Sequence, residues 1–311
     1  MNTAVAFIIF KRPDTTARVF AAIRAARPPR LYVIADGARP DKPGEPQAVS
    51  VTRALTDAVD WDCDVIRLYS DQNLGCRKRV QTGLDAVFAR EEEAIILEDD
   101  CLPDPSFFPY CEELLARYRK EPRVMHISGD NFLWGRCRTS SSYHFSRSVH
   151  VWGWATWRRA WHLYDADMAT WGGPLFEQNL LPGFVSEAER TYWLEAFGKI
   201  HDNPEKNTSW ATIWSYSVRV HDGLCVYPQV NLVENIGFDG EATHTFSMPD
   251  FYQPPARPIG PLKHPRTLTV HTRADALNFE TAFRYQEPRR LRQLKNWLRI
   301  KGGALRRKFI P

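Results

Sequence analysis

Short apolar runs separated by amphipathic stretches dominate the first 128 residues of the chain. Between the runs, apolar residues recur at helical spacing, as Val19, Phe20 and Ile23 do. A strand that alternates with a helix in this way is typical of a mostly parallel sheet with helices on its faces. The apolar runs of strand length are residues 5–10, 31–35, 63–69, 94–97 and 124–128. The pattern therefore predicts an α/β fold, whose ligands gather beyond the carboxyl ends of the strands.

Helices are expected between these runs, and the second half of the chain adds further elements. Pro13 breaks the first apolar run and starts a helix, because proline is tolerated in the first helical turn. Residues 39–46 are rich in proline and predict a loop. Further helices are expected at 50–58, through 83–88, and at 106–120, 186–200 and 209–214. Residues 224–228 and 231–233 predict short strands, and 235–245 a loop with glycine.

Three adjacent carboxylates, Glu98, Asp99 and Asp100, follow the apolar run 94–97 directly. Carboxylates at the end of a buried strand repel one another and need a counter-charge. A hard divalent cation, Mn²⁺ or Mg²⁺, would supply it and leave positions open for substrate phosphates. The alternative is a solvated acidic turn before the next helix, where Asp104 would cap the N-terminus. The position of the triplet after a buried strand favours the metal and diphosphate site.

A second polar segment, residues 70–79, feeds the helix that contains residues 83–88. It includes Asn73, Gly75 and Arg79, and a diphosphate could rest on such a helix N-terminus beside arginine. A solvated basic turn is the equally weighted alternative. Asp36 follows the second apolar run, so it also lies at the expected ligand edge.

Aromatic residues are concentrated between residues 149 and 171. Trp157, Trp161 and Tyr164 are at helical spacing and are expected to pack in the core. Trp152 and Trp154 flank Gly153, which indicates a turn where an aromatic face could meet the sugar of an acceptor.

Composition places the chain among globular proteins, with 43% hydrophobic residues, 11 Trp and 17 Phe. Its 6 cysteines contain no C-x-x-C pair, which favours reduced thiols over a zinc site. No signal peptide is visible, and no apolar run reaches the ~20 residues that span a bilayer. We therefore expect a cytoplasmic protein.

The C-terminal end is strongly basic. From Arg289 onward nine residues are Lys or Arg and none is acidic, whereas the net charge of the whole chain is only +4. Apolar residues such as Leu294 and Trp297 lie among these cations, a composition suited to an anionic membrane surface. The inner face of the cell membrane is thus a possible peripheral location, and a disordered cationic end is the alternative. Nucleic acid is not expected as a partner, because the rest of the chain is acidic and carries no nucleic-acid-binding motif.

Five stretches, taken in their order along the chain, resemble glycosyltransferases of the GT-A fold. They are AFIIFKRP, VIADG, SDQNLGCRKRV, AIILEDDCLPDPSFF, and SVHVWGWATWRRAW followed at a distance by NLVENIGFDGEATHT. The similarity covers residues 5–245. It is nearest to bacterial family-two-like transferases and more distant from the N-acetylglucosaminyltransferase I type. The resemblance implies one GT-A domain with a nucleotide-sugar-binding half at 1–122, an acceptor-binding half at 123–265 and a C-terminal extension at 266–311.

The resemblance also implies roles for single residues. Arg12 and Asp36 would hold the nucleoside, with Asp36 on the base, and Arg79 would approach the diphosphate. In the acidic triplet Glu98 would face the donor sugar, Asp99 the ribose and Asp100 the metal. The loop around His244 would close over the donor. From its place in the glycine-containing loop, His244 itself is a candidate metal ligand or phosphate donor, although a lone loop histidine is more often neither.

One position departs from the related pattern. Where the N-acetylglucosaminyltransferase I type has a catalytic Asp after the Trp of its matching segment, this chain has Ala211 after Trp210. A general base must lie within hydrogen-bond reach of the acceptor hydroxyl. Asp130 is the preferred candidate, because it follows the strand predicted at 124–128, and Asp239 and Glu241 are its rivals.

The function expected from the resemblance is a metal-dependent, inverting glycosyltransferase. The donor would be a nucleotide sugar, a UDP-sugar by family expectation, and the acceptor a glycan or lipid-linked sugar of surface polysaccharide synthesis. The first alternative is a degenerate GT-A domain that binds the donor or glycan without transfer. The second is a nucleotidyltransferase, against which stands the absence of glycine after the first apolar run, where Lys11–Asp14 lies instead.

Overall fold

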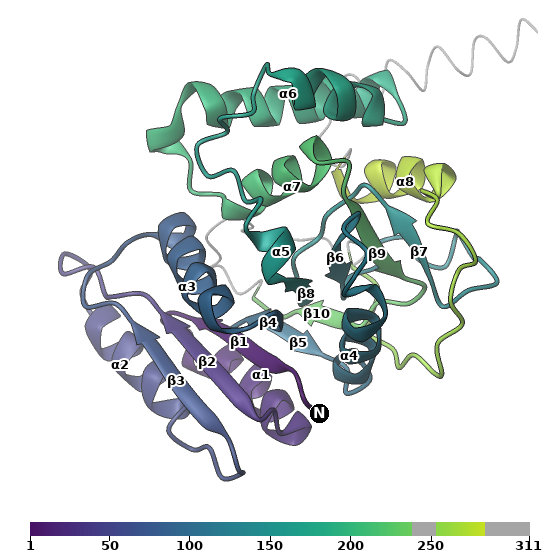
Figure 1. The fold of residues 1–311 in the computed structure, drawn as a ribbon. Helices are drawn as coiled ribbons and strands as arrows, with labels where there is room; N and C mark the ends of the chain where they lie inside the picture. Colours follow the sequence, from purple (N-terminus) through teal and green to yellow (C-terminus); the bar gives the residue numbers. More distant parts are fainter. Residues whose placement is uncertain (238–252, 284–311) are drawn as a thin grey trace, which may run out of the picture.

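The structure, a computed structural model, describes residues 1–237 and 253–283. Among these residues, eight strands form one mixed sheet in the order β3-β2-β1-β4-β8-β6-β9-β7, and β5 pairs with β10 in a separate ribbon (Figure 1). The strands are β1 Ala4–Ile9, β2 Arg30–Ala35, β3 Asp64–Tyr69, β4 Glu93–Glu98, β5 Cys101–Pro103, β6 Val124–Ser128, β7 Tyr143–Ser146, β8 Trp154–Trp157, β9 Leu224–Pro228 and β10 Val233–Asn235. The expected α/β class, with a mostly parallel sheet, is confirmed.

Helices connect most of the strands. In the described part of the chain the α-helices are α1 Pro13–Ala26, α2 Glu45–Leu55, α3 Cys76–Arg90, α4 Phe107–Tyr118, α5 Arg158–Trp161, α6 Glu187–Asp202, α7 Trp210–Val220 and α8 Thr272–Asn278. Pro13 stands at the start of α1 as the sequence predicts, and Ser209 caps α7 by accepting a hydrogen bond from the Thr212 backbone N–H.

Six of the strands run in the same direction. β1 is parallel to β2 and β4, and β2 to β3. β8 is antiparallel to both β4 and β6, so β6 runs parallel to β4, and β9 is parallel to β6. The carboxyl ends of β1, β2, β3, β4, β6 and β9 therefore lie along one edge of the sheet, which we call the carboxyl edge.

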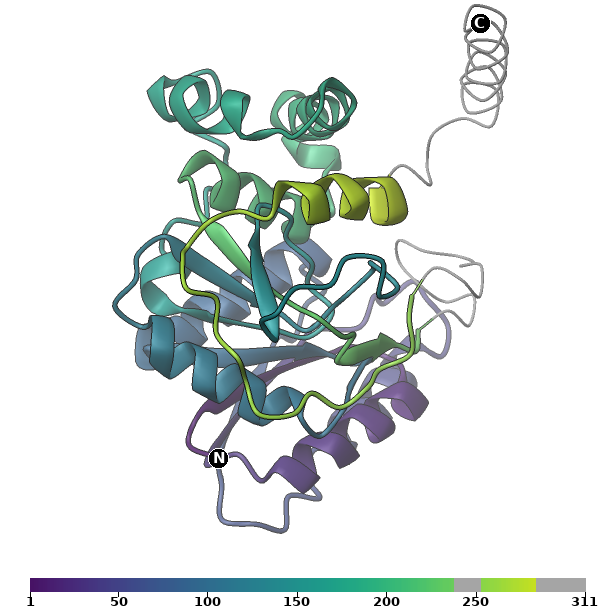
Figure 2. The ribbon, with the colours of Figure 1, turned by 90° about the vertical axis from the view of Figure 1, so that its right-hand side faces the viewer.

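The alternation of side chains along β1 explains the layers. Val5, Phe7 and Ile9 pack into one core with residues of α1 and α4, whereas Ala6 and Ile8 pack into a second core with residues of α3 and α7. Successive side chains of a strand point to opposite faces, so a fully apolar strand has to be covered on both faces. A further layer is formed by α6, which stacks on α7 away from the sheet (Figures 1 and 2).

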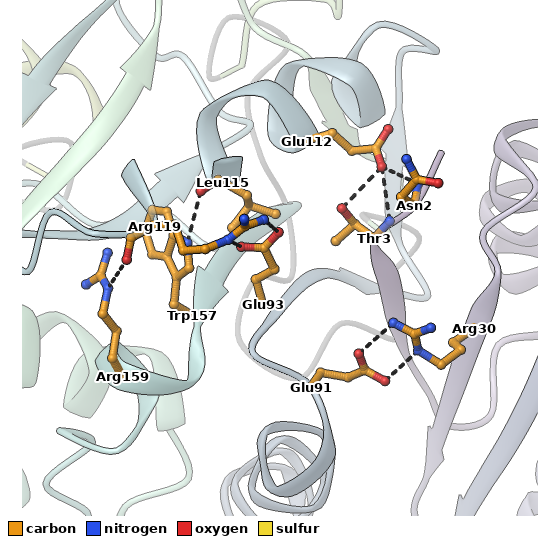
Figure 3. A network of polar contacts seen from close by, with 10 residues as sticks. All are labelled: Asn2, Thr3, Arg30, Glu91, Glu93, Glu112, Leu115, Arg119, Trp157 and Arg159. Carbon is orange, nitrogen blue, oxygen red and sulfur yellow. Dashed lines mark hydrogen bonds and ion pairs between the residues drawn. The ribbon is translucent and has the colours of Figure 1, made fainter. Parts of the chain in front are cut away.

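Ion pairs tie the parallel strands to their neighbours at the end opposite the carboxyl edge (Figure 3). Arg30 of β2 makes a two-pronged contact with Glu91, at 2.7 and 2.9 Å, and Arg119 makes another with Glu93 of β4, at 3.0 and 2.7 Å. Such paired contacts fix the geometry of both partners. They hold the start of β4 in register, and its end delivers the acidic triplet.

Several predicted elements differ in the structure. Helix α2 begins at Glu45 and not at residue 50, so the expected loop 39–46 is shorter. The strand expected at 231–233 is β10, Val233–Asn235. Strands β5, β7 and β8 were not predicted. Segment 253–269 runs over the outside of α4 to reach α8 (Figure 2), where the Ile259 N–H donates to the Ser106 hydroxyl. The predicted basic end from residue 289 lies outside the described residues.

Candidate functional site

A cleft of about 530 Å³ opens at the carboxyl ends of β1, β2 and β4. We call it the main cleft. Its remaining walls come from the loop before α3, from the segment before β8, from the start of α7 and from the end of β10. Most residues that the sequence singles out line it, namely Arg12, Asp36, Asn73, Gly75, Arg79, Glu98, Asp99, Asp100 and Trp152.

The acidic triplet lies on the floor of the main cleft. The Arg12 Nη1 atom is 2.8 Å from the Asp100 Oδ2 atom and 3.7 Å from the Asp99 Oδ1 atom. The Phe10 backbone N–H donates to Asp99 at 3.1 Å. Burial, followed by the charges of Asp100 and Asp99, raises the pKa of Glu98 to about 8. Glu98 therefore favours its neutral form near neutral pH, and the Arg12 guanidinium lies beside the other two carboxylates of the triplet.

Asp36 organises the loop in front of α3. Its carboxylate accepts hydrogen bonds from the backbone N–H groups of Leu74 and Gly75, both at 2.9 Å, and from that of Gly37 at 3.0 Å. The Asn73 amide donates to the Gly37 carbonyl at 2.7 Å. Asp36 is 6% exposed. In addition to lining the cleft, it therefore fixes the loop whose end, Gly75, begins α3.

Arg79 is a buried cation in the first turn of α3. Burial lowers the pKa of its guanidinium, and the nearby Asp36 carboxylate acts in the opposite direction. Among the described residues, its Nε atom has no hydrogen-bond partner. A buried, unsatisfied guanidinium N–H is costly unless an anion completes it. Its place on the wall of the cleft makes it a candidate anion ligand.

Glu45 positions two further cations at the mouth of the cleft, and sequence reasoning missed all three residues. Arg39 makes a two-pronged contact with Glu45, and the Lys11 Nζ atom is 3.4 Å from it. The hydrogen bond from Arg39 is the main reason that the pKa of Glu45 falls to about 2. The position of Glu45 in the first turn of α2 could have indicated this cluster. It was missed because the sequence predicted that this helix begins at residue 50, whereas it begins at Glu45.

Three carboxylates line the cleft, those of Glu98, Asp99 and Asp100, and the role of Asp100 as the metal ligand stays a prediction. Among the residues the structure describes, no group of three or more His, Cys, Asp or Glu side chains could enclose a metal. Mg²⁺ is commonly held by one or two carboxylates together with substrate phosphates. The carboxylates of the triplet, which line the cleft, suit a cation that arrives with such a substrate.

The two tryptophans proposed for an acceptor have different environments. Trp152 lines the main cleft. Trp154 is fully buried in β8, where its ring stacks on His126 at 5.1 Å between centroids and on Trp210 at 5.7 Å. The prediction that Trp154 presents a face to a sugar is therefore wrong. Alternation along β8 directs its side chain into the core between the sheet and α7.

Asp130, the predicted base, does not line the main cleft. It is 1% exposed, and its Oδ2 atom accepts a hydrogen bond from the Trp152 backbone N–H at 3.0 Å. Burial raises the pKa of Asp130 well above its usual range. This geometry does not support Asp130 as a base for an acceptor in the cleft, and it makes Asp130 a positioning residue for Trp152.

Ala211 occupies the position at which the N-acetylglucosaminyltransferase I type has its catalytic Asp. In the structure it lines the main cleft at the start of α7. Three other predicted residues, His244, Asp239 and Glu241, lie outside the described residues. Their predicted roles as metal ligand, rival bases and part of a closing loop stay predictions.

Comparisons with known proteins give distant structural likeness only. No protein-family model matches the sequence, and no curated protein matches it. Mouse xyloside xylosyltransferase 1 in its apo form is 10% identical, with a TM-score of 0.35 over 70% of this chain and 81% of that chain. UDP-glucose pyrophosphorylase complexed with UDP-glucose is 8% identical, with a TM-score of 0.35 over 76% and 94%. HddC from Yersinia pseudotuberculosis is 9% identical, with a TM-score of 0.32 over 58% and 86%. Likeness at this level does not indicate a substrate.

In the described part of the chain no helix is both long and apolar enough to cross a membrane.

Proposed function

We propose that the chain is a GT-A-fold glycosyltransferase that moves a sugar from a nucleotide-diphosphate donor, by expectation a UDP-sugar, to a glycan or lipid-linked acceptor. The observation that carries the proposal is the main cleft, where the acidic end of β4 faces the buried Arg79 across the carboxyl ends of parallel strands. This is the position at which nucleotides bind in open α/β sheets.

Each part of the donor has a matching group in the cleft. The ordered loop held by Asp36 offers a rigid wall for the nucleoside. Arg79 and the N-terminus of α3 suit the diphosphate, because both favour negative charge. Lys11 and Arg39 add cations at the mouth. The sugar would then lie between Glu98 and Trp152, with Ala211 leaving room for the acceptor.

Asp100 would hold Mn²⁺ or Mg²⁺ together with the diphosphate. A bound divalent cation there supplies Lewis-acid stabilisation of the departing nucleoside diphosphate. Arg12, whose Nη1 atom is 2.8 Å from the Asp100 Oδ2 atom, would be the neighbouring protein cation of that site. We infer an inverting reaction, in which the acceptor hydroxyl attacks the anomeric carbon and the diphosphate leaves with the bonding electrons. The hydroxyl proton would pass to a carboxylate base, for which Asp239 and Glu241 stay the predicted candidates.

Calorimetric titration of UDP with and without Mn²⁺ tests the donor site. We expect wild-type protein to bind UDP with Mn²⁺, and Asp100→Asn to lose at least about tenfold in affinity. Asp62→Asn removes the same charge from an exposed position outside the cleft and serves as the matched control. Binding of GDP or dTDP in place of UDP changes only the donor. Failure of every nucleotide to bind would refute the proposal.

Product analysis separates the proposed transfer from its alternatives. Incubation with UDP-sugars and Mn²⁺ should release UDP, and glycan or lipid-linked acceptors should increase the rate. A domain that only binds would show affinity without release. A nucleotidyltransferase would instead release pyrophosphate from UTP and a sugar 1-phosphate, and that result would replace the proposed reaction.

We further propose that residues 289–311 attach the protein to anionic membranes, because nine cations and no acid lie there among apolar residues. Flotation with phosphatidylserine-containing liposomes should recover the full chain and not a chain that ends at residue 288. Equal flotation of the two would refute this attachment.

A further inference from the structure

A second groove, of about 470 Å³, lies beyond the carboxyl ends of β6 and β9. Its walls are residues 131–142, which follow β6, residues 229–231, which follow β9, and residues 254–260. Since β6 and β9 run parallel to β1 and β4, this groove opens on the carboxyl edge that also carries the main cleft. We call it the second groove.

An exposed tryptophan stands on the wall of the second groove. Trp134 is 42% exposed, although a ring of this size is normally buried. Its backbone has φ 52°, in the left-handed region, and Gly135 follows with φ 69°. A non-glycine residue in this region costs roughly 1–2 kcal/mol. The chain thus holds a large flat apolar face toward solvent in a conformation that is intrinsically unfavourable.

The groove is cationic as well as aromatic. Arg138 and Arg257 line it, and both are exposed. No Asp or Glu is among the described residues that form its walls. The remaining polar groups are neutral hydroxyls and amides, such as Thr139, which accepts a hydrogen bond from the Gln229 amide at 2.8 Å. The lining suits a ligand that is polar and negatively charged.

Two buried asparagines make the floor rigid. The Asn131 backbone N–H donates to the Asn231 side chain at 3.0 Å, and the Asn131 amide donates to the Pro228 carbonyl at 2.6 Å. Asn231 in turn donates to the Pro254 carbonyl at 2.7 Å, which ties the third wall to the first two. A floor whose polar groups are already satisfied is preorganised for binding.

Asp130 links the second groove to the main cleft. Its neighbour Asn131 lies in the second groove, and its carboxylate holds Trp152, which lines the main cleft. One short segment of chain therefore contributes to both sites, and an extended ligand could run from one to the other along the carboxyl edge.

We propose that the second groove binds an acidic glycan, that is, carboxylate-bearing sugar units of the acceptor that lie away from the accepting hydroxyl. This inference rests on the proposed transfer function. Trp134 stacks on a sugar face, Arg138 and Arg257 pair with carboxylates, and the hydroxyls and amides meet sugar hydroxyls. Recognition of charged units outside the main cleft would make the enzyme selective for an acidic polymer.

Calorimetry with a tetramer of α-1,4-linked galacturonic acid tests the proposal, with maltotetraose as the neutral probe. We expect the acidic tetramer to bind at least about tenfold more tightly than the neutral one. Trp134→Asn and Arg257→Gln should each weaken the acidic tetramer by about tenfold. Asparagine tolerates the left-handed backbone, so the first variant removes the ring and keeps the turn. Arg266→Gln, an exposed arginine of the same segment outside the groove, is the matched control.

Three outcomes would overturn the proposal. The first is equal affinity for the acidic and the neutral tetramer. The second is unchanged affinity of Trp134→Asn for the acidic tetramer. The third is equal weakening of acidic tetramer binding by Arg257→Gln and Arg266→Gln, which would indicate unspecific attraction by surface charge. UDP titration of the same variants separates this inference from the proposed function. The groove variants should keep UDP affinity. Asp100→Asn should keep tetramer affinity even if UDP fails to bind any form of the protein.

Discussion

His126 makes stability sensitive to acid, because it is buried as a neutral ring. It has no solvent-accessible surface, and its Nε2 atom lies 2.8 Å from the His150 carbonyl oxygen. The Trp214 indole N–H donates to its Nδ1 atom at 3.1 Å. The neutral ring with the proton on Nε2 satisfies both contacts. Protonation of Nδ1 would place its N–H group against the Trp214 indole N–H and would bury a charge. Burial accordingly lowers the pKa of His126 to about 3.

The direction of the pH effect follows from this lowered pKa. Between pH 6.5 and 3 the unfolded chain binds a proton at His126 that the folded chain does not bind. The contribution of His126 to stability is therefore full above the unfolded pKa and is lost as the pH falls. Relative to pH 7.5, the loss at pH 5.5 is roughly 1.3 kcal/mol for this residue, with an unfolded pKa of about 6.5.

Urea denaturation of wild type and His126→Gln at pH 7.5 and 5.5 measures this contribution of His126 to the free energy of unfolding. The glutamine amide can still donate to the His150 carbonyl, but the Trp214 N–H loses its acceptor, so the variant should be less stable at pH 7.5 by about 1–3 kcal/mol. That deficit should shrink by roughly 1.3 kcal/mol at pH 5.5, since the variant has no proton to take up. His162→Gln removes an exposed histidine as the control.

Parallel loss of stability in wild type and His126→Gln on acidification would refute the reasoning. Burial also lowers the pKa of His150 to about 3, and it raises the pKa of Asp275 to about 6, which has the opposite effect on stability. Both groups are present in the two proteins, so the difference between the proteins isolates His126.

Three further substitutions test the packing and the site. Glu189→Gln should destabilise the fold by about 3–5 kcal/mol in denaturant titration, because it removes the counter-charge of the buried Arg219. In the wild type the Arg219 Nη2 atom is 2.8 Å from the Glu189 carboxylate. A loss below about 1 kcal/mol would contradict this prediction. Gly129→Ala should cost about 1–3 kcal/mol, since its Cβ would lie 2.7 Å from the Gly153 carbonyl oxygen, whereas Gly260→Ala, with nothing within 4 Å, should stay within about 0.5 kcal/mol. Asp36→Ala should weaken Mn²⁺-dependent UDP binding by at least about tenfold in calorimetry, because the loop before α3 loses its two hydrogen bonds to the carboxylate and Gly37 loses a third. Unchanged affinity would exclude the loop from the donor site.

The first half of the fold could be predicted because three of its strands, β1, β2 and β4, are buried on both faces. An apolar run such as β1 or β4 is recognisable without knowledge of its neighbours. β5, β7 and β8 have 3 or 4 residues each, and their pairing depends on partners distant in sequence. Trp154 illustrates the result, since the glycine before it indicated a turn, whereas pairing of β8 with β4 and β6 placed the ring in the core.

The residues of the main cleft could be predicted where they follow a strand. The acidic triplet and Asp36 stand at strand ends, so the α/β pattern alone brings them to the same edge. Glu45 and its two cations could not be found in this way, because their convergence depends on where α2 begins. Asp130 was placed at the correct edge, but the sequence did not show that its carboxylate turns inward to the Trp152 backbone.

The insertion of β8 between β4 and β6 has a consequence for synthesis on the ribosome. β4 and β6 are complete once residue 128 has emerged, yet the strand that joins them begins only at residue 154. Until then, the growing chain presents an open apolar strand edge, the kind of surface that recruits other chains. Yield of soluble protein should thus depend on translation speed and chaperone supply during this interval, even for variants whose finished fold is stable.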